Sequence, residues 1–398
     1  MEVRVQEEVP AAQRTGGHHP VREGEVFNMR YQALRELGCG AFATVWLCQD
    51  TRKKKNVAVK VLKSREGFAE AAQDEVSLLR CVSSMKRKDR AGENIVCLLD
   101  DFRMIGENGF HILLLGAMLG QQSLGLRWRA TGWCKTRVLA GLHFLHRRCR
   151  IIHADLKPEN VLLCVRDKGL QRLLSDAADC GQRKDLRLKG TGGDPGNQLE
   201  DSDLMSIEVK IADLGSACWT YKPFSREIQT QPYRALEVLL GLDYGTPADI
   251  WSTGCLAFEM ATGECLFDPQ PGKYFSRDDD HVARIIELLG RIPPRIAFSW
   301  NKSTKFFSRP GALLRISRLS PCSLHTVLVD RYKWRQHEAA PLTSFLLSAL
   351  RYAPEHRATA AQCLQHAWLR SPPAAPGGLP PAPGRPAPLR QPLGSPPR

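Results

Sequence analysis

The sequence predicts an α+β protein of two lobes, a smaller one rich in β-strands followed by a larger one rich in helices. Residues 31–115 alternate runs of Val, Ile and Leu with glycines and polar clusters, a spacing typical of antiparallel strands. After about residue 134 the apolar residues recur at helical intervals. With 398 residues, 43% hydrophobic and 25% charged, the chain has an ordinary globular composition, long enough for two or three packed units. We therefore expect two lobes and a ligand site in the cleft that separates them.

The elements of the first lobe follow from short apolar runs. Three strands are predicted for YQALREL, ATVWLC and VAVKVL, which begin at Tyr31, Ala43 and Val57. After the third of these strands, residues 67–80 carry apolar side chains at helical spacing and predict a helix that interrupts the strands.

The second lobe is expected to be mainly helical. Helices are predicted for VLAGLHFLH, DIWSTGCLAFEMATG, DHVARIIELLG and LTSFLLSALRY.

Three segments are expected to lie outside the packed lobes. Residues 1–30 are polar and predict a flexible leader, and residues 165–206, rich in Gly, Asp, Lys and Arg, predict a short insert. Residues 371–398 hold 11 of the 26 prolines and no acid, which predicts a disordered tail. The first lobe then covers 31–119, and the second covers 120–164 and 207–370.

The cysteines and the apolar runs indicate in which cellular compartment the protein works. The 13 cysteines include no C-x-x-C pair, so a zinc ribbon or redox dithiol is excluded and reduced thiols are expected. The N-terminus lacks the apolar core of a signal peptide, and the apolar run at 112–119 is too short to span a bilayer. We expect a soluble intracellular protein. Its net charge of +14 at first suggests an anionic partner.

Four short motifs carry chemistry. Gly38 and Gly40 link two predicted strands and would let the backbone approach a phosphate closely, and Lys60 ends a β-run. An acid, a cation and an amide occur in the loop at residues 153–160, and a carboxylate precedes a glycine in residues 211–215. Each alone has a simpler explanation, namely a tight turn, an edge lysine, an Asx-turn or a helix cap. Their joint occurrence in order is the stronger signal.

In this order the motifs resemble the protein-kinase pattern of Gly-rich loop, strand lysine, HRD loop, DFG and APE, from about Tyr31 to Leu369. The resemblance implies the bilobal protein-kinase fold, with ATP and Mg²⁺ as cofactors. It implies the following ATP-binding residues: Leu37, Gly38, Gly40, Val45, Ala58, Lys60, Glu75 and Leu119.

The resemblance also assigns roles in phosphoryl transfer. Lys60 would hold the α- and β-phosphates and pair with Glu75, while Asn160 and Asp213 would hold Mg²⁺. Asp155 would accept the substrate hydroxyl proton, and Lys157, at the spacing of serine/threonine kinases, would reach the γ-phosphate.

Two further contacts are implied by the resemblance. Glu237, in Ala-Leu-Glu where Ala-Pro-Glu is expected, would pair with Arg357, and Asp249 would anchor the catalytic loop.

Several stretches resemble one kinase family, the serine/arginine-rich (SR) protein kinases: IIHADLKPENVLL, IADLGSACW, TPADIWSTGCLAFEMATGE and RDDDHVARIIELLG. That family has a spacer between the halves of the kinase domain, which here is short, because Asn160 and Asp213 are 53 residues apart. The resemblance implies SR-type splicing factors with Arg-Ser repeats as substrates, a monomer in cytoplasm and nucleus, and no direct binding to nucleic acid or membrane.

A polycationic Arg-Ser repeat needs an acidic docking site. Glu264, Asp280 and Glu287 resemble the docking groove of the family, although an acidic helix start is the alternative explanation for residues 278–280. Arg234 and Arg277 match positions that receive a phosphorylated serine. Gln231 stands where a third arginine is expected, which puts processive modification in doubt.

Departures from the family leave two other hypotheses open. Ala43 replaces a glycine, Ala154 replaces the HRD arginine, and residues 115–136 have an irregular hinge and no helical periodicity. The irregularity of residues 116–136 motivates a pseudokinase or scaffold variant, whereas Ala43 is a tolerable change and the missing HRD arginine resembles the constitutive activity of the family. A basic nucleic-acid binder would need clustered cations interleaved with aromatics, whereas the basic run at 86–90 contains Asp89.

Overall fold

The computed structural model describes residues 17–40, 42–64, 68–117, 132–164, 208–298 and 305–370. The chain divides into two compact units. The first draws its described residues from Met1–Arg90, Ile95–Gly120 and Asp213–Gly215, and the second from Ala91–Asn94, Gln121–Ala212 and Ser216–Arg398.

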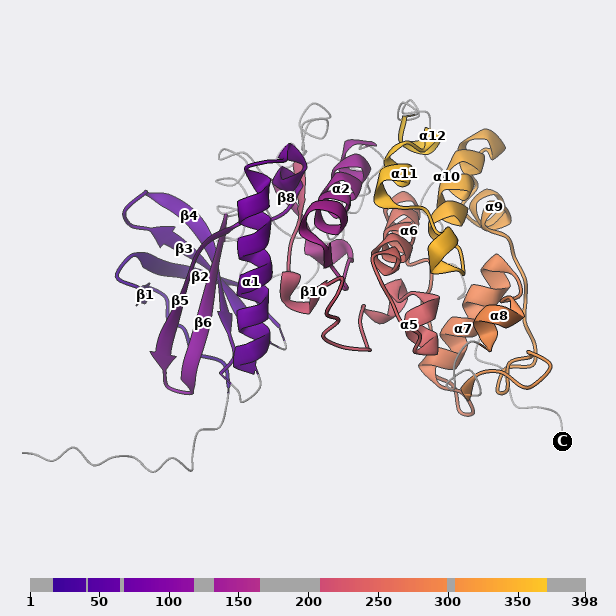
Figure 1. Cartoon of the computed structure of the whole chain (residues 1–398), viewed down its shortest axis with the longest axis horizontal. Coiled ribbons are helices and arrows are strands. Elements are labelled where there is room, and N and C mark those ends of the chain that lie inside the picture. The colour runs from indigo at the N-terminus through magenta and orange to yellow at the C-terminus, as the bar shows by residue number, and fades with distance from the viewer. Residues whose placement is uncertain are drawn as a thin grey trace, which may run out of the picture. The chain divides into compact units, whose positions relative to one another are not determined.

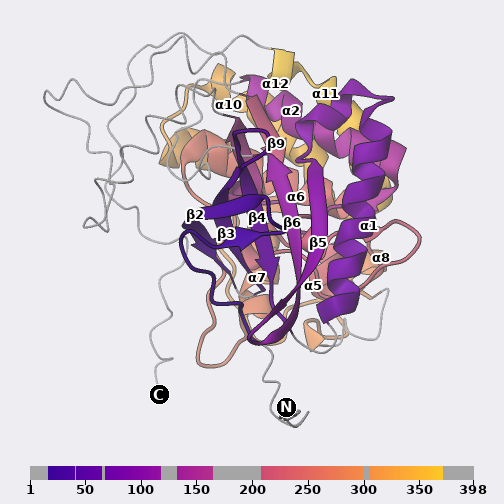
Figure 2. The ribbon, with the colours of Figure 1, turned by 90° about the vertical axis from the view of Figure 1, so that its left-hand side faces the viewer.

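The first unit is built on an antiparallel sheet in the order β1-β2-β3-β4-β6-β5. Its strands are β1 (Val26–Phe27), β2 (Tyr31–Cys39), β3 (Ala43–Asp50), β4 (Lys55–Leu62), β5 (Leu98–Gly106) and β6 (Gly109–Ala117). The helix α1 (Phe68–Lys86) interrupts the strands in sequence and runs beside β5 and β6 (Figures 1 and 2). The predicted strands and helix are thus present.

Buried and half-buried side chains alternate along β4, so the two faces of the sheet differ there. Along β4, Val57, Val59 and Val61 are buried, whereas Ala58 and Lys60 between them are half-buried. The valines join a core with aromatic side chains from β1, β2 and β3, among others. Each such buried side chain stabilises the fold by about 1.5–3 kcal/mol. The opposite face is left for polar chemistry.

The sheet begins before the predicted lobe boundary. Phe27 in β1 pairs with Tyr31 and is only 1% exposed, and Ser64 N donates to Gly17 O at 3.1 Å. The expectation of a flexible leader over residues 1–30 is therefore wrong for its C-terminal part. The physical reason is that a single aromatic in a polar segment reaches the core across a two-residue strand, which no periodicity reveals.

The second unit is mainly helical (Figure 1). Its helices are α2 (Gly132–Phe144), α5 (Leu236–Leu240), α6 (Pro247–Thr262), α7 (Arg277–Leu289), α8 (Pro294–Ala297), α9 (Leu324–Thr326), α10 (Gln336–Ala349), α11 (Ala360–Leu364) and α12 (Ala367–Arg370). Two short antiparallel ladders pair β7 (Ile151–Ile152) with β10 (Cys218–Trp219) and β8 (Val161–Cys164) with β9 (Glu208–Ile211).

Helix α6 forms the centre of this unit, in contact with α2 and α10. Its N-terminal and middle turns are buried, including Trp251 and Phe258. The buried residues thus lie on all sides of the helix and not along one stripe. It ends at Gly263, where φ of 82° is a conformation that suits glycine. The predicted α+β, bilobal fold class is confirmed.

Two exclusions hold for the described part of the chain. The cysteines whose side chains the structure describes are free thiols. No described helix combines the length and the apolarity that crossing a bilayer requires.

Candidate active site

In the first unit, Lys60 on β4 binds two carboxylates. Its Nζ donates to Glu75 Oε1 and to Asp213 Oδ1, both at 2.8 Å. Glu75 comes from α1, whereas Asp213 lies 153 residues after Lys60 in the chain. The expected pair of Lys60 and Glu75 is present, and the structure adds Asp213 to it.

The electrostatics keep this lysine charged. Burial lowers the pKa of Lys60, but the negative charges of Glu75 and Asp213 raise it by more, so the pKa lies above its usual value. An ammonium group held in this state is suited to bind phosphate oxygens.

Gly215 leaves space next to this cluster. A Cβ on Gly215 would lie 3.1 Å from Asp213 Oδ1 and 3.3 Å from both Glu75 Oε2 and Lys60 Nζ. Asp213 itself adopts φ of 62°. A left-handed aspartate followed two residues later by a glycine therefore lets the three charged groups meet.

The predicted phosphate-binding hairpin is formed by β2 and β3. Gly38 pairs with Val45, and Val45 pairs with Lys60 on β4. Leu37, Val45 and Ala58 are all half-buried. The hairpin thus places its glycines at the exposed end of two strands, and a branched side chain beside the lysine.

In the second unit, one buried carboxylate holds the catalytic loop. Asp249 on α6 is 0% exposed and accepts the N–H groups of His153 at 2.8 Å and Ala154 at 2.9 Å. His146 Nε2 lies 2.7 Å from the same side chain. The predicted anchoring role of Asp249 is present in these contacts.

The pKa of Asp249 reflects this setting. Burial raises the pKa, but the hydrogen bonds and charges of His146 and His153 together lower it by more, so the pKa lies below its usual value. Ala154 adopts φ of 64°, a left-handed conformation that costs an L-residue about 1–2 kcal/mol. The bonds to Asp249 offset that cost.

The central group of the loop is Asp155. Its Oδ1 accepts Thr230 N at 3.0 Å and Thr230 Oγ1 at 2.7 Å, and its Oδ2 lies 2.7 Å from Lys157 Nζ. Lys157 Nζ also donates to Thr230 Oγ1 at 3.0 Å. One hydroxyl therefore joins the predicted base to the predicted phosphate-binding lysine.

Thr230 was missed at the sequence level. It lies 75 residues after Asp155, in a segment where only Gln231 and Arg234 drew attention. The sequence feature that could have pointed to Thr230 is its position five residues before the Ala235-Leu236-Glu237 motif.

Asn160 is oriented by the same loop. Its Nδ2 donates to Asp155 O at 2.8 Å, and Ala212 N donates to Asn160 O at 2.8 Å. With the amide nitrogen engaged, the side-chain oxygen is the atom left for a hard cation. Asp213 follows Ala212 in the chain.

The predicted pair of Glu237 and Arg357 is present and buried. Arg357 Nη1 and Nη2 donate to the two carboxylate oxygens at 2.7 Å and 2.8 Å, with side-chain exposures of 0% and 2%. The pair ties α5 to the segment before α11.

The three acids predicted for docking do not form an open acidic surface. Asp280 is 2% exposed and accepts from Arg284 Nε at 2.7 Å, and Glu287 is 9% exposed and accepts Ser320 N at 2.9 Å. Glu264 is more open, at 36% side-chain exposure, and accepts from Arg331 at 2.8 Å. Hydrogen bonds within the chain therefore hold all three.

The acidic start of α7 has a structural role as well. Asp279 closes a capping box with Ser276 and pairs with Arg315 at 2.9 Å. The helix-start explanation thus applies to Asp279, because α7 begins at Arg277.

The two predicted phosphoserine-binding arginines lie near one histidine. Arg234 donates to Ile228 O and Gln229 O, and Arg277 donates to Pro269 O. Burial and the charges of Arg234, Arg284 and Arg277 lower the pKa of the buried His281 to about 3. A third cation, Arg284, therefore accompanies the predicted two, and Gln231 Nε2 instead donates to Asp278 at 3.0 Å.

Some predictions fall outside the described residues. They concern Leu119, the part of the irregular segment at 118–131, the insert at 165–206 and the tail from 371. Among the described residues no group of three or more His, Cys, Asp or Glu is arranged to hold a metal.

Comparisons with known proteins agree with this geometry. Residues 31–369 match the protein kinase domain. The chain is 36% identical to human SRSF protein kinase 3 over 512 aligned positions, which cover 92% of this chain and 90% of that protein. The chain belongs to the SR protein kinase family.

Two other members agree. The serine/threonine-protein kinase SRPK of Physarum polycephalum is 38% identical, with 89% of each chain covered. Protein kinase dsk1 of Schizosaccharomyces pombe is 33% identical over 92% of this chain and 86% of that protein. This SR protein kinase is thus an enzyme, a protein serine/threonine kinase that uses ATP and a divalent metal. Nothing in the described residues or in the relatives favours the pseudokinase alternative.

Proposed function

We propose that this kinase transfers the γ-phosphoryl group of ATP to serines within Arg-Ser repeats of splicing factors and thereby regulates mRNA splicing. The observation that carries the proposal is the hydrogen-bonded set of Asp155, Lys157 and Thr230 in a chain that aligns over 92% of its length with an SRSF protein kinase.

When bound, ATP supplies the phosphoryl group, and the divalent ion neutralises its developing charge. Lys60, kept charged by Glu75, binds the α- and β-phosphate oxygens. Gly38 and Gly40 let the backbone of the hairpin approach the phosphates, and Leu37, Val45 and Ala58 would line the nucleotide site.

Asp155 acts as the base. A carboxylate oxygen accepts the proton of the serine hydroxyl while the serine oxygen forms a bond to the γ-phosphorus and the bond to the leaving ADP oxygen breaks. Thr230 fixes Oδ1 through two hydrogen bonds, so the carboxylate is oriented in advance. Lys157 stabilises the charge on the transferred group.

We propose Mg²⁺ as the metal. Asn160 and Asp213 offer an amide and a carboxylate oxygen, and Mg²⁺ is commonly held by one or two carboxylates together with substrate phosphates. A set of two oxygen ligands without thiol or imidazole fits this ion better than zinc.

Substrate recognition rests on charge of both signs. Glu264, the most open of the three predicted docking acids, would meet a cationic repeat together with Asp278, which has 32% side-chain exposure and lies 3.7 Å from Lys305 Nζ. Asp280 and Glu287 support that region from within. Arg234 and Arg277 would receive a phosphorylated serine.

We propose further that the enzyme acts as a monomer on protein substrates, without binding nucleic acid or membrane directly. As an enzyme for splicing factors, it would work in cytoplasm and nucleus.

The test is phosphate transfer from radiolabelled ATP to an Arg-Ser repeat peptide. We expect transfer with Mg²⁺, none with Asp155→Asn or Lys60→Met, and at least tenfold less with a peptide in which Ala replaces every Arg. Equal transfer to the Arg and Ala peptides would refute the substrate class. Equal incorporation by wild type and Asp155→Asn would refute the catalytic assignment.

A further inference from the structure

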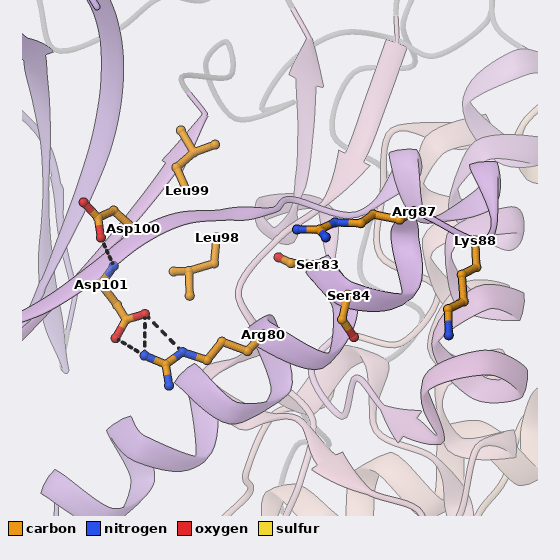
Figure 3. A pocket seen from close by; sticks show the side chains of 9 residues that line it. All are labelled: Arg80, Ser83, Ser84, Arg87, Lys88, Leu98, Leu99, Asp100 and Asp101. Atoms are coloured by element: carbon orange, nitrogen blue, oxygen red, sulfur yellow. Dashed lines mark hydrogen bonds and ion pairs between the residues drawn. The ribbon is translucent and has the colours of Figure 1, made fainter. Parts of the chain in front are cut away.

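A hollow of about 480 Å³ lies on the first unit, between the C-terminal half of α1 and the start of β5 (Figure 3). Its lining residues are Arg80, Ser83, Ser84, Arg87, Lys88, Leu98, Leu99, Asp100 and Asp101, and none of them is a predicted site residue. The size is that of a small ligand or a few residues of peptide.

The helix supplies one wall by its periodicity. Arg80, Ser83 and Ser84 stand at spacings of three and four residues, so they share one face of α1, and Arg87 follows in the turn directly after the helix ends at Lys86. The Oγ atom of Ser83 is buried and has no hydrogen-bond partner among the described residues. A buried hydroxyl of this kind destabilises the fold unless a polar partner satisfies it.

The strand supplies an apolar wall. Leu98 pairs with Gly116 and Asp100 pairs with Leu115, so Leu99 is the extra residue of a β-bulge. Leu99 is consequently 55% exposed. Bulges of this kind turn a side chain to a new direction, often beside a binding site.

Charge is compensated at one end of the hollow and not at the other. Asp101 accepts from Arg80 Nη2 at 2.9 Å, and Asp100 accepts from Tyr31 OH at 2.8 Å and lies 3.8 Å from Arg30 Nη1. By contrast, the exposed side chains of Arg87 and Lys88 have no ion-pair partner in the described parts of the chain. Figure 3 shows these two cations on the side away from Asp100 and Asp101.

We propose that this hollow docks an acidic peptide segment of a partner protein that carries a leucine-like side chain. The acidic side chains bind Arg87 and Lys88, a polar group of the peptide bonds the Ser83 hydroxyl, and the apolar side chain covers Leu98 and Leu99. A nucleic acid fits less well, because the lining holds no aromatic side chain for stacking and two carboxylates would face the phosphates.

The experiment measures fluorescence anisotropy of labelled peptides with the full chain. The probe is Gly-Leu-Glu-Asp-Asp-Leu-Gly, compared with its amide form Gly-Leu-Gln-Asn-Asn-Leu-Gly, a form with Ser for both Leu, and a seven-nucleotide oligouridylate. We expect saturable binding of the acidic probe that weakens with salt, and at least tenfold weaker binding of the amide form. The Ser form should bind several times more weakly.

Two double variants test whether the peptide binds at this hollow. Arg87→Ala with Lys88→Ala removes the two uncompensated charges from the exposed turn that follows α1. The control, Arg52→Ala with Lys53→Ala, removes the same charge from an exposed turn of the same unit. We expect at least a tenfold loss for the first pair and less than a twofold change for the control.

Several outcomes would overturn the proposal. They are equal binding by the two double variants, no binding of the acidic probe at millimolar concentration, or oligouridylate bound as tightly as the peptide. The assay needs no nucleotide, so its result is independent of the proposed kinase reaction.

Discussion

The buried pair of Glu237 and Arg357 allows a quantitative prediction of stability. Besides the two bonds to Glu237, Arg357 donates to Pro247 O at 2.9 Å and to Arg351 O at 3.0 Å, and its guanidinium carbon lies 5.1 Å from the ring centroid of Trp251. Glu237→Ala removes both carboxylate oxygens and leaves a guanidinium with almost no access to water. We expect a loss of about 3–5 kcal/mol in the free energy of unfolding, because one charge stays buried without its partner.

A substitution of Arg357 and a substitution of both residues complete a double-mutant cycle. Arg357→Met leaves the carboxylate unpaired and should cost a similar amount. Replacing both, by Glu237→Leu with Arg357→Met, removes both charges but still loses the two bonds to backbone carbonyls. At about 0.5–1.5 kcal/mol for each of those bonds, the double variant should lose about 1–3 kcal/mol, less than either single variant.

The assay is urea unfolding followed by far-UV circular dichroism, supported by thermal unfolding. A loss of about 3–5 kcal/mol should lower the midpoint temperature by about 6–20 °C for a unit of this size. The reasoning is refuted if Glu237→Ala costs less than about 1 kcal/mol, or if the two single losses add up to the loss of the double variant.

Three shorter predictions test other features. Thr230→Val should lower kcat on a peptide substrate about 10- to 100-fold, because the Asp155 carboxylate loses its hydroxyl donor, whereas Thr230→Ser should keep most of the rate. The hydrogen bond from Arg30 lowers the pKa of Asp50, so the charged form stabilises the fold above pH 4 and that contribution declines as pH falls below about 4. The difference in thermal midpoint between wild type and Asp50→Asn should therefore shrink from pH 7 to pH 3, and a constant or growing difference would contradict this sign. Phe27→Ala should destabilise the first unit by about 3–5 kcal/mol in urea unfolding, and a surface-like loss below 1 kcal/mol would show that β1 adds little.

The sequence predicted the fold class and the catalytic motifs because both are written in local patterns. The alternation along β4 and the spacing within residues 153–160 each need only a few neighbouring residues. The kinase resemblance then predicted long-range pairs such as Lys60 with Glu75.

What the sequence did not reveal depends on non-local pairing. The acids of α7 look like a free cluster until Arg315, 36 residues away from Asp279, is seen to bind one of them. Thr230 likewise gains its role only from the approach of a loop 75 residues distant. Charge compensation and orientation of this kind are properties of the packed structure.

Strand β1 has a practical consequence. The match to the kinase domain begins at residue 31, yet Phe27 lies inside the sheet and β1 covers the outer edge of β2. A chain trimmed to start at Tyr31 would expose unpaired backbone groups along that edge and open an apolar gap beneath it. Exposed edges of this kind pair with other chains. Recombinant protein cut at the family boundary should consequently aggregate, whereas protein that begins before Gly17 should stay monodisperse.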